Sequence, residues 1–548
     1  MQKLRVIPLG GLGEIGKNMT VFEYGNNAII VDAGLMFPEG DHLGIDYIIP
    51  DMGYLIEHRE RLNIHGIIVT HGHEDHTGAI KHVMDIVDAP IFATPLTIGL
   101  LKNKLKEARK SSTELITIQA GDVIKRGPFE VETFHVTHSI PDCIGIAIRT
   151  PVGLVVHTGD FKFDHTPVDG WAPDFARIAK YGSESVLALF SDSTNADKPG
   201  WTPSETVIDA GFDRVFAAAT GRIMVATFAS LISRIDQAAT ACQKHGRKMA
   251  IVGHSMTENI KMARQLGYLE FPESLIVSLD QAQKMKPEKV VLMVTGSQGE
   301  PSAVLSRLAN NRQANLEIEP GDTVILSANP IPGNEEMVQR TINKLIQRGA
   351  EVIYDAIEVV HVSGHASQEE MKLMINLVRP KFFVPVHGEL RHLHLHARLA
   401  QMLGIPKENC AIVENGTIIE FTPNKMEIVD RYPGGYVFVD GAGVGDIGPA
   451  VMRDREILAA EGFVIVFAAV DKKGRLTEEP RIISRGFVFL READELFSNM
   501  RETVRRTIKK FNNGRTADAV EEALNRMIYQ ETKRRPMIFV HIHQSVAD

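Results

Sequence analysis

The segment "HGHEDH", residues 71–76, constrains this chain more than any other feature, because it follows the apolar residues "GIIVT" and crowds ionisable side chains into one turn. Its side chains comprise three imidazoles and two carboxylates: His71, His73, Glu74, Asp75 and His76. A solvated histidine-rich loop is one interpretation, but such crowding is costly unless a cation organises it. Imidazole nitrogen and carboxylate oxygen are ligands of Zn²⁺ and Mn²⁺. The segment therefore predicts a metal site at a strand exit, where His71 and His73 can face one ion and Asp75 and His76 a second.

Two ions need more ligands than this turn supplies, and other predicted strand exits offer candidates. His138 lies in "FHVTHSIPD", Asp160 in "VVHTGDFKFD" and His387 in "FVPVHGEL". Each ends an apolar segment and precedes turn residues, where a rigid strand can hold a ligand that reaches a cleft. Taken singly, these histidines would be ordinary ones. Together with residues 71–76 they predict a two-metal site.

A glycine motif near the amino terminus suggests a different chemistry. Gly11–Gly16 spells G-x-G-x-x-G and Asp32 follows 21 positions after Gly11, a spacing typical of a dinucleotide-binding turn. Such a turn must open a helix. Between Gly16 and Asp32, "MTVFEY", "GNN" and "AIIV" predict strand, turn and strand, with too little room for a crossover helix. We therefore expect a tight turn at the rim of the site, with Asp32 facing the metal cluster.

Length and composition indicate an ordinary multidomain protein of the cytoplasm. At 548 residues, the usual size of about 150 residues per domain suggests three or four units. No apolar segment approaches the roughly 18 residues of a membrane span, and no signal-peptide core is evident. The 3 cysteines are far apart and outside any C-x-x-C pattern, so they fit a reducing compartment without disulfides or a thiolate zinc site. The net charge of −9 means that a nucleic acid would need a local basic channel.

The order of predicted elements changes along the chain. The first 160 residues read mainly as strands, with helices in "HTGAIKHVMDIVD" and "PLTIGLLKNKLKEARKS". "TPSE", Thr202–Glu205, has the pattern of a capping box and predicts a helix start. Strands and helices then alternate, which predicts a mostly parallel sheet covered by helices. After a Gly-rich connector, "YPGGYVFVDGAGVGDIGPA", the last 90 or so residues predict a small α/β unit.

These motifs resemble the metallo-β-lactamase superfamily, and the segment between "STNADKPGWTPSE" and "HVSGHAS" resembles the β-CASP insertion of its nucleic-acid-processing members. The resemblance is closer still to the ribonuclease J family, through "PLGGLGEIGKNM", "VTHGHEDHTGAI", "HTGDFKFD", "SDSTNADKPG", "TGSQGEP", "HVSGHAS" and "PVHGE". It implies an α/β fold: a metallo-β-lactamase αββα sandwich with an inserted β-CASP α/β domain and a small C-terminal α/β domain. The implied limits are 1–205 for the first part of the sandwich, 206–366 for the β-CASP domain, 367–445 for the second part with its linker, and 456–548 for the C-terminal domain.

The resemblance also implies roles for individual residues. One metal would be held by His71, His73, His138 and Asp160, and the other by Asp75, His76, Asp160 and His387, with Asp160 bridging. Asp75 and His365 would be catalytic, and Asp32 would orient the cluster from behind. Whether His365 is a general acid or only a phosphate contact stays open. The segment that binds substrate phosphate would be His361, Val362, Ser363, Gly364 and His365, and the role implied for Asp192 is structural.

The function implied is a two-metal ribonuclease that hydrolyses RNA phosphodiester bonds, as a 5′-to-3′ exonuclease with endonuclease activity, in RNA maturation and decay. Expected cofactors are two divalent ions per subunit, Zn²⁺ or Mn²⁺ with Mg²⁺ possible. Expected partners are single-stranded RNA, preferably 5′-monophosphorylated, a second or further copy in a homodimer or homotetramer through the C-terminal domain, and other RNA-decay proteins, with no membrane.

Two alternatives differ in testable ways. Another hydrolase of this fold, acting on a lactam or thioester, would leave the insertion without a role. A non-catalytic RNA-binding scaffold would have eroded ligands, whereas every expected position is filled. Histidines outside the cluster, in "RHLHLHARLA" and at positions 541 and 543, are expected to decorate a helix and a strand face.

Overall fold

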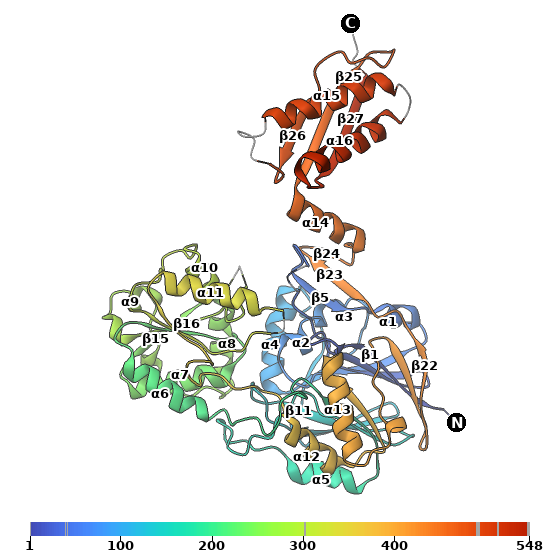
Figure 1. The fold of residues 1–548 in the computed structure, drawn as a ribbon. Helices are drawn as coiled ribbons and strands as arrows, with labels where there is room; N and C mark the ends of the chain where they lie inside the picture. The colour runs from blue at the N-terminus through green and yellow to red at the C-terminus, as the bar shows by residue number, and fades with distance from the viewer. Residues whose placement is uncertain are drawn as a thin grey trace. The chain divides into compact units, whose positions relative to one another are not determined.

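The computed structural model describes residues 2–38, 40, 42–300, 303–331, 333–488, 494–511 and 515–544. Contacts divide the chain into two units (Figure 1). The large unit comprises residues 1–39 and 47–437, and the small unit comprises residues 40–46 and 438–548.

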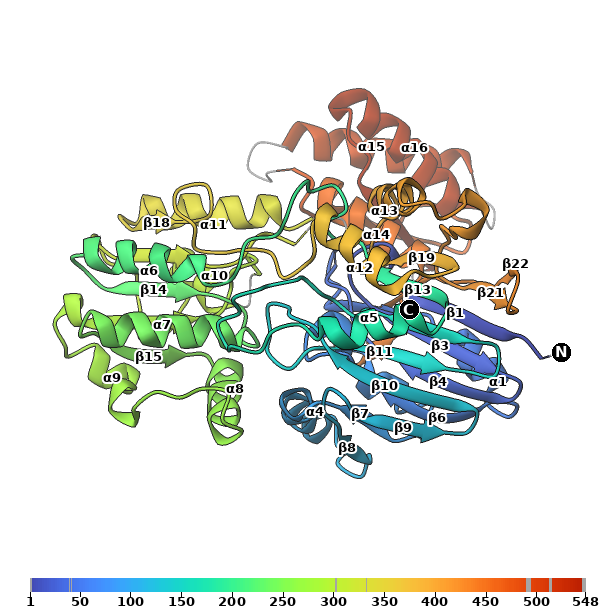
Figure 2. The ribbon, with the colours of Figure 1, turned by 90° about the horizontal axis from the view of Figure 1, so that it is seen from below.

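Two packed sheets form the frame of the large unit (Figure 2). The eight-stranded sheet has the order β22-β21-β1-β3-β4-β6-β7-β8, and the six-stranded sheet the order β19-β13-β12-β11-β10-β9. Their facing apolar side chains form one core, in which the Phe22 and Phe190 rings meet edge to face at 5.6 Å. The strands of the first sheet are β1 (Leu4–Gly10), β3 (Met19–Tyr24), β4 (Asn27–Val31), β6 (Asn63–Ile68), β7 (Ile91–Ala93), β8 (Leu115–Thr117), β21 (Thr417–Phe421) and β22 (Met426–Arg431). Those of the second are β9 (Val123–Arg126), β10 (Phe129–His135), β11 (Ile144–Arg149), β12 (Leu154–His157), β13 (Val186–Asp192) and β19 (Phe382–Val386).

Helices complete this layered arrangement. Helices α5 (Phe175–Ser183), α12 (Gln368–Val378) and α13 (Leu390–Met402) pack on the six-stranded sheet and on one another. Helices α1 (Gly53–His58), α2 (Glu74–Thr77), α3 (Ile80–Val83) and α4 (Pro95–Glu107) lie between strands of the other sheet in the sequence. Short strands β2 (Leu12–Gly13) and β20 (Gly388–Glu389) pair in parallel, and β5 (Tyr47–Pro50) and the 3₁₀ helix η3 (Lys407–Asn409) complete the frame.

The segment between β13 and β19 contains a separate five-stranded parallel sheet of order β15-β16-β14-β17-β18. This confirms the parallel sheet that the alternating pattern predicts. Its elements are α6 (Val207–Ala218), β14 (Ile223–Ala226), α7 (Ile232–Lys244), β15 (Lys248–Val252), α8 (His254–Gln265), η1 (Glu273–Leu275), α9 (Leu279–Ala282), η2 (Pro287–Lys289), β16 (Val290–Val294), α10 (Val304–Ala309), β17 (Thr323–Leu326), α11 (Glu335–Gln347) and β18 (Glu351–Ile353).

The small unit is a three-stranded sheet with two long helices. Strand β25 (Phe463–Val470) lies between β26 (Arg481–Arg485), antiparallel to it, and β27 (Met537–Gln544), parallel to it. Helices α15 (Asp494–Lys510) and α16 (Thr516–Thr532) pack against each other over a core that includes Val464, Val504 and Leu524. The Gly-rich connector contains β23 (Tyr436–Asp440) and β24 (Gly443–Val444), and α14 (Pro449–Glu461) follows it.

Two helix predictions are wrong in detail. In place of one helix from His76 onward, the chain forms two four-residue helices, α2 and α3, which are separated at Gly78 and Ala79. A Cβ on Gly78 would lie 2.4 Å from the Leu35 side chain. Thr202 begins no helix, because α6 starts at Val207. Thr202 Oγ1 instead donates to the carbonyl of His365, so a tertiary contact replaces the helix cap.

Other predictions about the whole chain have separate outcomes. Among the residues placed in the structure, no helix is both long and apolar enough to cross a membrane. Cys143, Cys242 and Cys410 are all free thiols, as the sequence predicts. The limits of 1–205, 206–366, 367–445 and 456–548 for the domains stay a prediction.

Candidate metal centre

The glycine motif forms a turn, and no helix follows it. Strands β3 and β4 after the motif pair as an antiparallel hairpin, as predicted for "MTVFEY", "GNN" and "AIIV". A Cβ on Gly10 would lie 1.8 Å from the carbonyl oxygen of Lys17, so the chain folds tightly on itself here. Strand β2 within the motif pairs with β20, which directly follows His387. The turn therefore lies beside the candidate metal centre, and the dinucleotide interpretation has no structural basis.

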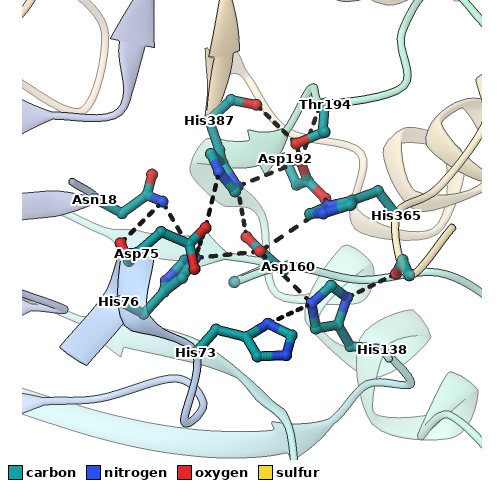
Figure 3. Close-up of polar contacts among 12 residues, drawn as sticks. Asn18, His73, Asp75, His76, His138, Asp160, Asp192, Thr194, His365 and His387 are labelled. Atoms are coloured by element: carbon teal, nitrogen blue, oxygen red, sulfur yellow. Dashed lines mark hydrogen bonds and ion pairs between the residues drawn. The ribbon is translucent and has the colours of Figure 1, made fainter. Parts of the chain in front are cut away.

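Three histidines from two loops form the first donor group: His71, His73 and His138. Figure 3 shows the facing rings of His73 and His138. His73 Nδ1 lies 3.1 Å from His71 Nε2 and 3.1 Å from His138 Nε2. The outer nitrogens of two rings are already engaged: His138 Nδ1–H donates to the carbonyl of Gly364 at 2.7 Å, and His71 Nδ1 lies 3.1 Å from Thr70 Oγ1. Three ring nitrogens therefore converge on one point.

The second donor group comprises Asp75, His76, Asp160 and His387. His76 Nε2 lies 3.1 Å from Asp160 Oδ2, and His387 Nε2 lies 3.4 Å from Asp75 Oδ2. His387 Nδ1–H donates to Asp160 Oδ1 at 2.8 Å, which leaves Nε2 of this buried ring without a hydrogen-bond partner. His387 also has a left-handed backbone, with φ of 50°, which costs energy in a non-glycine residue and is typical of functional sites.

Asp160 links the two donor groups. Its Oδ2 atom lies 3.7 Å from His71 Nε2 and 3.8 Å from His138 Nε2, as well as close to His76. The carboxylate is buried and its Oδ1 faces His387. This is the position that a bridging ligand between two ions requires.

The donor geometry fits metal ions better than it fits an internal hydrogen-bond network. With their Nδ1 atoms engaged, His71 and His138 present bare Nε2 lone pairs, and His73 Nδ1 can donate to only one of them. Nitrogen separations of 3.1 Å match the edge of about 3.3 Å expected for a tetrahedron with 2.0–2.1 Å bonds to zinc. The residues present therefore fit divalent metals such as Zn²⁺ or Mn²⁺.

Asp32 lies directly behind the second donor group. Its Oδ2 accepts from His76 Nδ1–H at 2.8 Å, which leaves Nε2 free to face the centre. Thr70 holds this carboxylate in place, because its backbone N–H donates to Oδ1 at 2.8 Å and its hydroxyl donates to Oδ2 at 2.9 Å. Asp32 thus contacts His76 at the ring nitrogen that points away from the centre, and its orienting role stays a prediction.

His365, from the segment that follows β18, faces Asp160 from the far side of the centre. Its Nδ1–H donates to Asp192 Oδ2 at 2.8 Å, and Nδ1 lies 3.9 Å from Asp160 Oδ2. Asp192 is completely buried at the end of β13 and also accepts from Thr194. The sequence implies only a structural role for Asp192. In the structure this carboxylate contacts His365 directly.

The segment 361–365 passes along the centre with several of its groups fixed. Val362 is buried in the core. Ser363 Oγ accepts from Asn195 Nδ2 at 2.8 Å and from the His365 backbone N–H at 3.2 Å, so the hydroxyl hydrogen of Ser363 is free to be donated. Nδ1 of His361 is buried and has no hydrogen-bond partner.

Burial and charge give the two donor groups different electrostatics. Burial lowers the pKa of His73 to about 4 and the pKa of His71 and His138 well below the usual value, which keeps these imidazoles in the neutral form that binds metal. Burial also opposes charge on His76 and His387, but Asp160 and its neighbouring carboxylates outweigh it. They raise the pKa of His76 well above its usual value and that of His387 to about 10. The second donor group therefore attracts positive charge, which a proton or a metal ion can supply.

Known protein families match successive parts of the chain. The model of the metallo-beta-lactamase superfamily matches residues 12–194, and that of the ribonuclease J beta-CASP domain matches 220–345. The model of the Zn-dependent metallo-hydrolase RNA specificity domain matches 349–411, and that of the ribonuclease J C-terminal domain matches 450–545.

Relatives match over nearly the whole chain. Ribonuclease J of Synechocystis is 44% identical, over 98% of this chain and 86% of the relative. Ribonuclease J of Thermus thermophilus is 43% identical, over 98% and 94%, and ribonuclease J2 of Bacillus subtilis is 42% identical, over 98% of both. The chain belongs to the ribonuclease J family. The fold and the metal-dependent ribonuclease class inferred from the sequence are thereby confirmed.

The likeness also extends to a more distant fold relative. A solved structure of a protein of unknown function from Enterococcus faecalis aligns with a TM-score of 0.54 and 19% identity, over 76% of this chain and 100% of that one. At that identity the likeness concerns the fold alone.

In this ribonuclease J family member, the sequence did not indicate the contact of Asn18 with the centre or the burial of two histidines on α13. Asn18 Nδ2 lies 3.2 Å from His76 Nε2 and donates to the Asp75 carbonyl at 3.3 Å. Its only signal was its place at the end of the glycine motif. His392 and His396 were expected to decorate a helix surface, but both are buried, and His396 Nδ1 lies 3.0 Å from Ser193 Oγ.

Replacing Asp32 by Asn is expected to weaken metal binding about 10- to 100-fold, the usual cost of losing a partner that orients a ligand. The amide can present a donor to His76 Nδ1 where a carboxylate oxygen now accepts. Titration of metal-free protein with Zn²⁺ or Mn²⁺, followed by calorimetry, measures the effect. Asn27→Ala, on the same hairpin but beyond the centre, is the control, and an unchanged affinity in Asp32→Asn would contradict the orienting role.

Proposed function

We propose that this ribonuclease hydrolyses single-stranded RNA from its 5′ end in the 5′-to-3′ direction and also cuts internally, in RNA maturation and decay. The observation that carries the proposal is the pair of donor groups joined by Asp160, with His365 and the segment 361–365 beside them. Two adjacent cation sites suit a phosphodiester, whose negative charge repels an attacking hydroxide.

The proposed cofactors are two divalent ions per subunit, Zn²⁺ or Mn²⁺ with Mg²⁺ as a third candidate. His71, His73, His138 and Asp160 would hold one, and Asp75, His76, Asp160 and His387 the other. When bound, such ions supply positive charge for the phosphate and acidify the attacking water. The mixture of imidazole and carboxylate donors supports Zn²⁺ and Mn²⁺ over an all-oxygen cation such as Ca²⁺.

Two side chains of the centre are assigned to proton movement. Asp75 is the most exposed member of its donor group, with 29% of its side chain accessible, so one carboxylate oxygen can accept the proton of the attacking water. His365 has 19% of its side chain accessible and a fixed Nδ1–H. Burial opposes charge on His365, but Asp192 and Asp160 outweigh it and raise the pKa of the ring above its usual value, so Nε2 can carry a second proton. That Nε2–H can protonate the leaving oxygen or donate to a phosphate oxygen.

The segment 361–365 is assigned to the substrate phosphate. The free hydrogen of the Ser363 hydroxyl and backbone amides of the segment provide donors for phosphate oxygens. Val362 anchors the segment in the core, and Nδ1 of His361 is buried. A pocket formed by this segment that holds a single phosphate would favour a 5′-monophosphate over a triphosphate.

Further partners are proposed from the same family. A homodimer or homotetramer through residues 456–548 is supported by the exposed Phe467 and Phe539 on the sheet of the small unit. Other RNA-decay proteins are possible additional partners. The free cysteines support a reducing, cytoplasmic location.

The proposal is tested by presenting one RNA sequence in three forms, 5′-monophosphorylated, 5′-triphosphorylated and circular, to purified protein with Mn²⁺, Mg²⁺ or Zn²⁺. We expect rapid 5′ trimming of the monophosphorylated RNA, slower trimming of the triphosphorylated RNA, and internal cuts in the circle. If only the linear RNAs were digested and the circle stayed intact, the endonuclease part of the proposal would be wrong. No cleavage in any metal would contradict the proposal and favour a non-catalytic scaffold.

A further inference from the structure

A cluster of buried charges lies beneath the segment 361–365 and belongs to neither donor group. It comprises Lys162, Glu205 and Arg234, whose side chains are 0%, 6% and 1% exposed. We call these three residues the buried triad. Lys162 follows strand β12, Glu205 precedes α6, and Arg234 lies on α7 of the inserted domain. Three distant parts of the sequence thus meet at one point.

Glu205 is the centre of the triad. Its Oε1 lies 3.2 Å from Lys162 Nζ, and its Oε2 lies 2.7 Å from Arg234 Nη2. Asp164 supplies a second carboxylate, with Oδ2 3.8 Å from Lys162 Nζ, and accepts from the Glu205 backbone N–H at 2.9 Å. Two cations and two carboxylates balance the charge, as burial requires.

The remaining donors of the two cations hold the backbone at Val360, directly before the segment 361–365, and at Ser363 within it. Arg234 Nη1 donates to the carbonyl of Val360 at 2.8 Å, and Lys162 Nζ donates to the carbonyl of Ser363 at 3.2 Å. Arg234 Nη1 also donates to Ser327 Oγ at the end of β17. One carboxylate therefore orients both cations that fix this backbone.

The fixed backbone in turn fixes groups of the centre. The carbonyl of Gly364, next to Ser363, is the acceptor that orients His138. The carbonyl of His365 accepts from Thr202 Oγ1 at 2.7 Å and from Asn195 Nδ2 at 3.0 Å, which places the His365 ring beside Asp192. A shift at Val360 or Ser363 would therefore reach both a metal ligand and the proposed phosphate donor.

We propose that Glu205 is a positioning residue for RNA hydrolysis, which acts through Lys162 and Arg234 to hold the phosphate-binding segment against the metal centre. The inference rests on the proposed role of that segment. Buried ion clusters add little to stability compared with apolar packing, so stability alone is a weak reason for this arrangement.

The test compares Glu205→Gln with a matched control in the same domain. Asp322→Asn breaks a similarly buried pair, in which Asp322 accepts from Arg222 at 2.8 and 2.6 Å, but at the amino end of β17 and away from the segment. For both variants we would measure Tm, kcat and KM on 5′-monophosphorylated RNA, Zn²⁺ affinity, and amide hydrogen exchange of residues 360–367.

We expect Glu205→Gln to lower kcat about 10- to 100-fold, the range seen when an orienting partner is lost, and to speed exchange in 360–367. Asp322→Asn should lower Tm similarly with kcat and local exchange unchanged. Equal losses of kcat in both variants, or a kcat for Glu205→Gln within about threefold of the parent protein, would overturn the inference.

Arg234→Lys decides the question if Glu205→Gln does not fold. It keeps the buried charge, but one ammonium group cannot span Glu205 and the Val360 carbonyl as the planar guanidinium does. A reduced kcat with Tm near that of the parent protein supports the inference, and an unchanged kcat overturns it. Parent protein that cleaves no RNA would instead reject the proposed function.

Discussion

Asp160→Asn is expected to lower kcat/KM for RNA by about 10³-fold or more, because one side chain serves both donor groups. Its Oδ1 lies 2.8 Å from His387 Nδ1 and its Oδ2 3.1 Å from His76 Nε2. Asparagine keeps one acceptor and puts an NH₂ donor where the other oxygen stands, so it cannot join two cation sites. Initial rates on 5′-labelled RNA, together with the metal content of the purified variant, measure the effect.

Asp85→Asn is the control for that experiment. Asp85 is an exposed carboxylate that pairs with Lys110 on the surface, so its loss should leave both rate and metal content unchanged. An Asp160→Asn protein that keeps its metal and loses less than about tenfold in kcat/KM would show that the bridging assignment is wrong.

His365→Ala is expected to lower kcat about 10²-fold or more while RNA still binds, since the loss of acid–base assistance usually costs that much. The ring sits beside Asp160 and is held by Asp192, so its orientation is fixed before substrate arrives. Single-turnover rates with saturating RNA separate this loss from a loss of binding.

Two further variants interpret the His365 result. Asp192→Asn should cost about 10- to 100-fold in kcat, because it loosens the ring without removing it. His394→Ala changes an exposed histidine on α13 and should have no effect. If His365→Ala loses less than about tenfold in kcat with normal RNA affinity, the residue has no catalytic role.

The residues of the two donor groups were accessible from sequence because they lie in the turns, or in the short helix α2, that directly follow apolar strands. Their role as metal ligands stays a prediction. This pattern is local in the sequence: a run of apolar residues precedes His71 and His387, and a polar turn follows each. The glycine motif was also readable, since the residues between Gly16 and Asp32 leave no room for a helix. Parallel strands then bring the strand ends together at one edge.

Residues whose partners are far away in the chain were not accessible in this way. Asp192 and His365 are 173 positions apart, and nothing near Asp192 specifies its partner. "TPSE" matches the local pattern of a capping box, but Thr202 and Glu205 contact His365 and Arg234 instead. A short-range rule fails here because buried tertiary partners compete for the same side-chain oxygens.

The spread of the metal ligands along the chain has a consequence during synthesis. The second donor group joins Asp75 and His76 to His387, and β20 reaches its partner strand β2 only after residue 388. At about 5–20 residues per second, roughly 15 to 60 s separate translation of Asp75 from that of His387. A nascent chain therefore lacks a complete metal centre while it is still attached to its own messenger RNA, the kind of molecule that the finished protein is proposed to cut.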